Sequence, residues 1–198
     1  ESLVFRGAVP VSQHDRMRCP HQVGSFDGPV KYGYINVGRV ERGSGLEGRN
    51  VFCLFPHQDR YVVNRSDVTV LPEGMDPSIA VLAANMETAV NGVWDARPLR
   101  TDRVTVIGAG VVGALVAWRL QFEVDAPVEL IDTRSDREAL ARALGMTFSL
   151  PHDAQADRTL IVHASGSEAG LRQALELAAD DGRIVEMSWY GDRDVSLP

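Results

Sequence analysis

Residues 104–113 read Val104-Thr105-Val106-Ile107-Gly108-Ala109-Gly110-Val111-Val112-Gly113, and this stretch decides the fold of the chain. It has the pattern of a buried strand, a glycine turn and the first turn of a helix. Gly108 allows a tight turn, Gly110 lets the backbone come close to a pyrophosphate, and Gly113 lets the helix pack close to the strand. The free amide groups and positive dipole end of that helix would face the phosphates. The stretch therefore predicts a dinucleotide-binding turn.

A second apolar run, Val128 to Ile131, ends in Asp132, about 24 positions after Gly108. An acid at this spacing accepts hydrogen bonds from the adenosine ribose hydroxyls. Asp132 favours NAD, because its carboxylate would repel the 2′-phosphate of NADP. Arg134 keeps NADP open as the alternative, because an arginine nearby can bind that phosphate. The turn residues Val111 and Val112 complete this part of the predicted cofactor site.

Strands and helices alternate in the rest of this half. A capping box of Ser135 and Glu138 predicts a helix that runs to about Leu144. A strand at residues 160–162, a helix from Ser167 through Ala179, a turn at residues 181–182 and a strand at residues 183–187 are expected to follow. This order predicts an α/β fold with a Rossmann-type, doubly wound parallel sheet. Three residues after the 160–162 strand are expected beside the cofactor, although a plain connecting turn is the alternative: Ala164, Ser165 and Gly166.

The chain up to about Leu71 is rich in glycine, proline and short β-type runs, and no helix is expected there. The expected strands cover residues 34–40, 50–55 and 60–63. Asp76 as N-cap and Pro77 at the first helical position then open a helix whose apolar face continues to Val93. The predicted domains are a β-rich part, 1–76, and a dinucleotide-binding part, 77–198.

The amino-acid composition limits the classes of partner that the chain is expected to bind. The net charge is −7, with 20 basic and 27 acidic residues, and the basic residues are scattered. This argues against nucleic acid or an anionic membrane as the main partner. No apolar run approaches the roughly 20 residues that span a bilayer, and no signal peptide is visible, so a cytoplasmic protein is expected. Cys19 and Cys53 are interpreted as free thiols in a reducing compartment.

Taken together, these features resemble the medium-chain dehydrogenase/reductases, the zinc-type alcohol dehydrogenase superfamily. The resemblance covers essentially all 198 residues. It implies a partial GroES-like catalytic domain before the dinucleotide-binding domain, whose C-terminal part would be missing, and a homodimer for a full-length chain. Its markers are the strand at residues 34–40, the turn at 48–51, residues 61–63 and 71–74, the helix with Glu87-Thr88-Ala89, and the glycine turn.

The zinc ligands of that family are not matched. Its Gly-His-Glu motif would fall on Gly33-Tyr34-Ile35, and a helix position that often supplies a third ligand is Ala84. A structural zinc lobe needs four cysteines, whereas the chain has two. A tetrahedral zinc site needs several converging Cys, His or carboxylate ligands. No zinc is therefore expected, with ligands outside this segment as the alternative.

The resemblance implies an NAD(P)-dependent oxidoreductase that moves a hydride between the nicotinamide and a small alcohol, carbonyl compound or activated alkene. Without zinc, a hydrogen-bond donor must stabilise the substrate oxygen. Four residues are candidates, each with an ordinary structural alternative: Tyr34 (packing), His57 (an exposed loop), Glu87 (a surface carboxylate) and Thr88 (a small helix residue). The alternative function is a non-catalytic dinucleotide-binding module.

Overall fold

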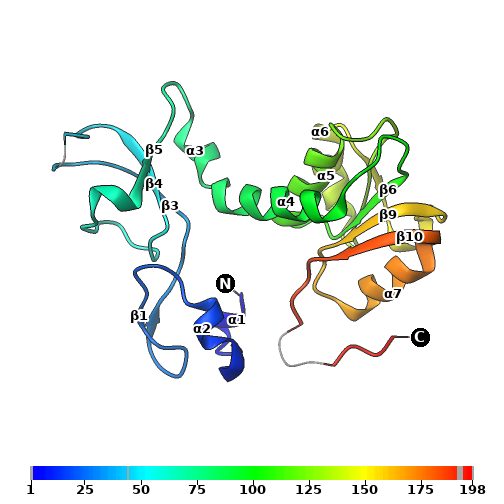
Figure 1. Cartoon of the computed structure of the whole chain (residues 1–198), viewed down its shortest axis with the longest axis horizontal. Coiled ribbons are helices and arrows are strands. Elements are labelled where there is room, and N and C mark those ends of the chain that lie inside the picture. The colour runs from blue at the N-terminus through cyan, green and yellow to red at the C-terminus, as the bar shows by residue number, and fades with distance from the viewer. Residues whose placement is uncertain (1, 44, 191–193, 198) are drawn as a thin grey trace. The chain divides into compact units, whose positions relative to one another are not determined.

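The computed structural model describes residues 2–43, 45–190 and 194–197. The chain divides into two compact units, residues 1–84 and 85–198 (Figure 1). This division falls after the helix that begins at Pro77, whereas the sequence pattern places the boundary before it, at residue 76. Each unit is described separately below.

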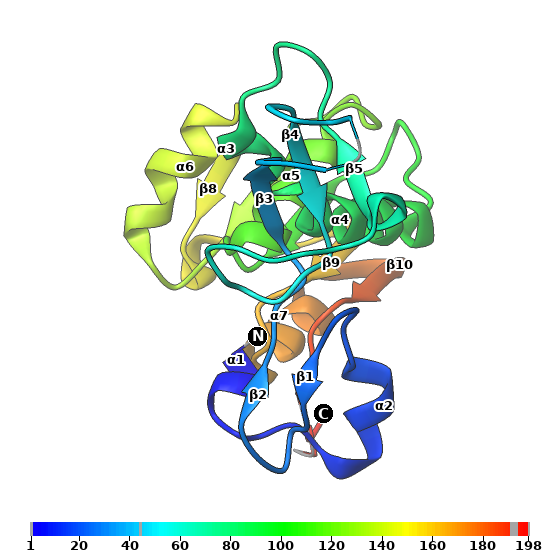
Figure 2. The same cartoon turned by 90° about the vertical axis from the view of Figure 1, so that its left-hand side faces the viewer.

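The first unit is built from short elements. An antiparallel sheet has the order β3-β4-β5, and β1 pairs with β2 in a second antiparallel ribbon; Figure 2 shows β3, β4 and β5 side by side. In chain order the elements are α1 (Ser2–Phe5), η1 (Val11–Gln13), α2 (His14–Met17), β1 (Val23–Gly24), β2 (Val30–Lys31), β3 (Asn36–Arg39), β4 (Asn50–Cys53), η2 (Arg65–Asp67), β5 (Val68–Val70) and α3 (Pro77–Ala80).

Two expectations for this unit are wrong. Residues 60–63 form no strand and pair with none of β3, β4 and β5. Tyr61 instead stacks on Phe55 with ring centroids 3.9 Å apart, and Val62 is 97% exposed. Helices do occur before Leu71, but α1 and α2 are single turns, too short to show a helical period in the sequence.

The start of the next helix is as predicted. Asp76 Oδ1 accepts a hydrogen bond from the Ser78 amide at 2.9 Å, and Pro77 is the first helical residue. The helix does not continue unbroken, because the Leu82 amide donates to Ile79 O at 3.0 Å in a three-residue turn. A new helix, α4, then runs over Ala83–Ala96.

The second unit contains a five-stranded sheet in which every strand pair is parallel, in the order β10-β9-β6-β7-β8. Strands and helices alternate along the chain, which confirms the predicted Rossmann-type α/β fold. Its elements after α4 are β6 (Val104–Ile107), α5 (Val111–Leu120), β7 (Glu129–Ile131), η3 (Ser135–Arg137), α6 (Glu138–Ala143), β8 (Thr147–Ser149), η4 (Pro151–Asp153), β9 (Arg158–His163), α7 (Glu168–Leu177) and β10 (Ala178–Glu186).

Helices cover both faces of this sheet. Side chains of β6 such as Val104 and Val106 pack in a core with α4, α5 and α6. Ile107 packs on the other face with Ile161 and Leu177, the last residue of α7. Because successive residues of a strand point to opposite faces, both faces are apolar, as in buried parallel sheets.

Three local expectations in this unit differ from the structure. The last helix ends at Leu177 rather than at residue 179, because Ala178 already pairs with Arg158 of β9. The predicted turn at residues 181–182 is an irregularity inside β10, where the register shifts. Ser135 does not cap a helix through its side chain: it is the first residue of η3, and Glu138 pairs with Arg142 at 2.7 Å.

Candidate functional site

The candidate site lies at the carboxyl ends of β6 and β9. The chain runs from β6 outward to β7 and β8, and then returns to β9 on the other side of β6. Ligands of open α/β sheets bind at such a switch point. The loops that follow β6 and β9 are in contact at this point. The Ala164 amide donates to Ile107 O at 2.8 Å, and Gly108 faces the backbone of Ser165.

The fold itself requires two of the three glycines of the dinucleotide-binding turn. Gly108 has φ +108°, and a Cβ there would lie 2.8 Å from the Ser165 amide nitrogen. A Cβ on Gly113 would lie 1.9 Å from the carbonyl oxygen of Gly108. Both positions are therefore closed to any larger residue, by the turn and by the approach of α5 to β6.

Gly110 is different. Its φ is −73°, which any residue adopts, and a Cβ built on it would meet no heavy atom within 4 Å. Neither the backbone conformation nor the packing of the chain requires glycine here. The open space in front of this residue is what a pyrophosphate would need.

The N-terminus of α5 faces the same turn. Gly110 is its N-cap and supplies no side-chain cap, and the first intrahelical bond runs from the Ala114 amide to Gly110 O at 2.9 Å. The amides of the first helical turn have no intrahelical acceptor, so they can donate to an anion. Val111 is 49% exposed beside the turn, whereas Val112 packs on the core.

Asp132 is held rigidly just after β7. Its Oδ2 accepts from the Ala109 amide at 2.8 Å, and its Oδ1 accepts from the Arg134 amide at 2.9 Å. Each carboxylate oxygen has a further lone pair for a ribose hydroxyl. The Arg134 guanidinium makes two hydrogen bonds to Asp136, at 3.0 and 2.6 Å, and this pairing holds the pKa of the Asp136 carboxyl below its usual range.

The loop after β9 contains a group that the sequence analysis missed. His163 is fully buried, with Nε2 2.6 Å from Ser165 Oγ and Nδ1 2.7 Å from Glu186 Oε2. Gly166, with φ +67°, donates its amide to Ser188 Oγ at 3.0 Å. The sequence did contain a signal for this group, because a histidine ends an apolar strand directly before Ala164-Ser165-Gly166.

The four proton-donor candidates belong to different units. In the first, the Tyr34 ring meets Tyr32 edge-on at 6.2 Å, and the His57 ring lies over Gly33, so that a Cβ there would be 2.6 Å from it. In the second, Glu87 Oε1 accepts from Asn91 at 2.8 Å and Thr88 is exposed on α4.

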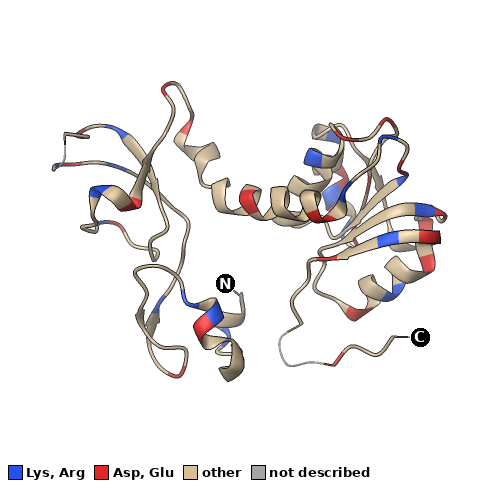
Figure 3. Ribbon diagram, viewed as in Figure 1, with Lys and Arg blue, Asp and Glu red and all other residues tan. Residues whose placement is uncertain are grey.

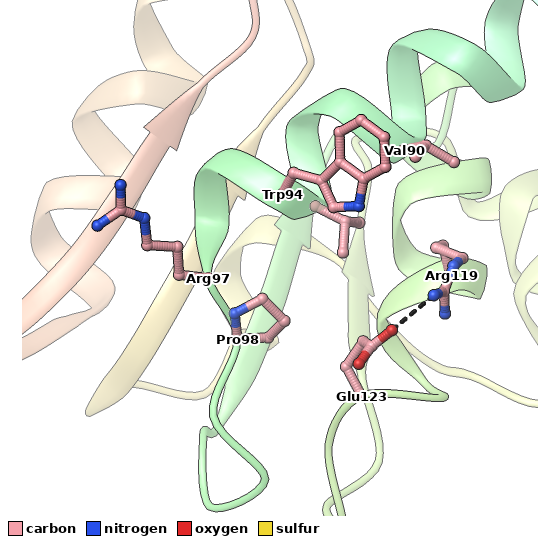
Figure 4. Close-up of a pocket in the computed structure, with 7 residues that line it drawn as sticks. Val90, Trp94, Arg97, Pro98, Arg119 and Glu123 are labelled. Carbon is pink, nitrogen blue, oxygen red and sulfur yellow. Dashed lines mark ion pairs between the residues drawn. The ribbon is translucent and has the colours of Figure 1, made fainter.

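A separate hollow of about 290 Å³ lies at the other end of α5 from the glycine turn. Trp94 of α4 borders it, together with the 2.6 Å ion pair between Arg119 of α5 and Glu123 in the turn after that helix (Figure 4). The other lining residues are Val90, Val93, Arg97 and Pro98. It contains none of the predicted site residues.

The distribution of charged residues and of potential metal ligands does not single out the candidate site. Basic and acidic residues are scattered along the ribbon of both units (Figure 3). Across the described residues, no cluster of three or more His, Cys, Asp or Glu side chains is placed to hold a metal ion. Over the same residues, no helix is long and apolar enough to span a bilayer.

Comparisons with known proteins agree with this geometry. No protein-family model matches the chain. The L-threonine 3-dehydrogenase of Bacillus velezensis is 26% identical over 129 residues, which cover 59% of this chain and 37% of that protein. The L-idonate 5-dehydrogenase of Escherichia coli K-12 superposes with a TM-score of 0.71 at 17% identity, over 84% of this chain and 61% of that one.

A short chain alcohol dehydrogenase of Escherichia coli CFT073, solved with its cofactor NADH, superposes with a TM-score of 0.68 at 21% identity, over 84% of this chain and 63% of that one. The chain therefore spans less than two thirds of the length of each of these relatives. The comparisons thus show similarity to dehydrogenases over part of their length, in sequence to the first of these proteins and in fold to the two solved structures.

Proposed function

We propose that this chain binds a nicotinamide dinucleotide and forms part of an oxidoreductase that transfers a hydride between that cofactor and an alcohol or carbonyl compound. The observation that carries the proposal is the open space at Gly110 beside the uncapped N-terminus of α5. The dehydrogenase relatives and the NADH-bound neighbour support the same assignment.

The residues of the second unit have separate roles in this proposal. The first-turn amides of α5, including those of Val111 and Val112, hold the pyrophosphate, and Asp132 accepts from the adenosine ribose. The loop Ala164-Ser165-Gly166 lies at the same switch point and borders the cofactor. A bound nicotinamide supplies or accepts the hydride, and the protein positions it.

We further propose that this segment contributes no zinc ligand. Tyr34 stands where the resemblance places a histidine ligand, and a phenol is not among the usual zinc ligands. Tyr34, with the neighbouring His57, is then the candidate hydrogen-bond donor for the substrate oxygen, and activated alkenes remain within the substrate class. In a longer chain that turns over substrate, Tyr34→Phe tests this role.

The first test is Gly110→Asp. We expect the variant to fold normally, because the added side chain enters open space, and to lose NADH binding at least tenfold, because its carboxylate occupies the place of the pyrophosphate. Isothermal titration with NADH measures the dissociation constant, and circular dichroism checks the fold.

Gly28→Asp is the matched control. Gly28 also has no heavy atom within 4 Å of an added Cβ, and it belongs to the first unit, so the change adds the same charge outside the glycine turn. Equal NADH binding by the wild type and Gly110→Asp would reject the proposal. NADH binding without turnover of any alcohol or carbonyl compound by a longer chain would favour the non-catalytic module.

Cofactor preference gives a second test. We expect the wild type to prefer NADH, because Asp132 repels a 2′-phosphate and Asp136 occupies the Arg134 guanidinium. Asp136→Ala frees that guanidinium, and NADPH binding should strengthen several-fold while NADH binding stays unchanged. Titration with both cofactors measures the ratio of dissociation constants. An unchanged ratio would show that Arg134 does not reach the 2′ position.

A further inference from the structure

Three side chains of the second unit form a continuous hydrogen-bonded chain, from Ser165 through His163 to Glu186. The Ser165 Oγ to His163 Nε2 distance is 2.6 Å, and the His163 Nδ1 to Glu186 Oε2 distance is 2.7 Å. A carboxylate only accepts hydrogen bonds, so the neutral imidazole carries its proton on Nδ1. Nε2 is then the acceptor for the Ser165 hydroxyl proton.

The carboxylate at the end of this chain is held in place. Glu186 Oε2 also accepts from the Tyr190 hydroxyl at 3.1 Å, and Oε1 accepts from the Ser188 amide at 2.6 Å. Burial and the neighbouring Glu186 carboxylate raise the pKa of Tyr190 to about 12, so its hydroxyl remains a donor at neutral pH. The acid that orients the imidazole is therefore itself fixed.

The two ends of the chain differ in exposure. His163 is 0% exposed, whereas Ser165 lies on the surface of the unit. The buried Nε2 of His163 needs a hydrogen-bond partner, and that partner is the hydroxyl of an exposed residue, which also lies 2.8 Å from Ser167 Oγ. A shielded base, a fixed acid and a hydroxyl on a surface residue are the parts of an activated nucleophile.

The first turn of α7 packs directly against this pair. A Cβ on Gly170 would lie 2.4 Å from Ser165 Oγ and 2.6 Å from His163 Nε2. Only glycine lets the helix come so close. The amide of Ser167, the N-cap of α7, donates to Ser165 Oγ at 3.3 Å, so the first turn of this helix lies beside the serine oxygen.

We propose that Ser165 is an activated nucleophile that reacts with activated acyl or phosphonyl esters, with His163 as its general base and Glu186 as the residue that positions His163. The inference goes beyond the proposed function and does not rest on it, because no dinucleotide takes part in the step.

The step is balanced within the chain and the ester. With a fluorophosphonate, Ser165 Oγ bonds to phosphorus, the P–F bond breaks, fluoride leaves and the hydroxyl proton passes to His163 Nε2. With a carboxylic ester, Oγ bonds to the carbonyl carbon, and the alcohol leaves with the proton returned from Nε2. No oxidant or reductant is needed.

The experiment labels the full chain with a fluorophosphonate in the absence of dinucleotide and maps the adduct by peptide mass spectrometry. Fragmentation distinguishes Ser165 from Ser167, and exposed Ser135 serves as the internal background. We expect Ser165 to react at least about a hundred times faster than Ser135, the lower range for general base catalysis. Reaction at Ser135's rate, or at Ser167 instead, would overturn the proposal.

Two variants separate an activated serine from one that is merely exposed. His163→Gln should reduce labelling of Ser165 to the rate of Ser135. Glu186→Gln, at a half-exposed side chain, tests the same chain if the buried substitution does not fold, and should slow labelling at least tenfold. Wild-type labelling rates in a folded variant of either kind would overturn the proposal. NADH titration of the same samples reports on dinucleotide binding separately.

Discussion

Gly113→Ala is expected to destabilise the second unit by roughly 3 kcal/mol or more, the upper range for overpacking. The added Cβ would lie 1.9 Å from the carbonyl oxygen of Gly108, which is backbone and not a movable side chain. Gly108 is itself held in place, because its amide donates a hydrogen bond to Ile131 O at 2.7 Å. Alanine's higher helix propensity, about 1 kcal/mol, is too small to offset this clash. Urea unfolding followed by tryptophan fluorescence measures the effect, because Trp94, Trp118 and Trp189 all lie in this unit.

Gly110→Ala is the matched control, three residues away in the same turn. No heavy atom lies within 4 Å of its new Cβ, so the free energy of unfolding should change by less than about 1 kcal/mol. Equal destabilisation by the two substitutions would contradict the distinction between glycines that the packing requires and the one that it leaves open. Dinucleotide titration of Gly110→Ala then shows how much space the ligand needs.

Much of this site could be predicted because its signals are local. The β-branched strand, the three glycines and Asp132 lie within 30 residues, and the chemistry of each residue type limits what it can do. Sequence alone did not show that Gly108 and Gly113 are closed to any side chain, while Gly110 is open. That difference depends on Ser165 and on the Gly108 carbonyl, which only the folded sheet brings near.

The features of the fold and site that the sequence did not predict depend on tertiary contacts. His163 meets Glu186 and Ser188, more than 20 positions later, and no local pattern links them. Residues 60–63 have the composition of a strand, but they pair with none of β3, β4 and β5. Strand propensity describes a surface on which side chains can pack, and here Tyr61 stacks on Phe55 while Val62 is exposed.

A buried ion pair at the amino ends of two strands of the parallel sheet is expected to give the other large effect. Glu129 of β7 and Arg158 of β9 are joined at 3.1 Å, with side chains 2% and 7% exposed. The Glu129 carboxylate also accepts from the hydroxyls of Thr105 at 2.8 Å and Ser149 at 2.6 Å. Arg158→Met removes the cation that pairs with Glu129, and should destabilise the unit by about 3–5 kcal/mol, because an uncompensated charge stays buried.

Two further variants establish the cause of that loss. Arg103→Met removes the exposed pair of Arg103 with Asp157, 45% and 74% exposed, and should cost at most about 1 kcal/mol. Adding Glu129→Gln to Arg158→Met removes the unpaired charge, and most of the lost stability should return. If the double variant is as unstable as Arg158→Met alone, the arginine acts by filling space. If the stability of the double variant recovers, the main role of Arg158 is to neutralise the buried Glu129 carboxylate, which lies on the strand that leads to Asp132.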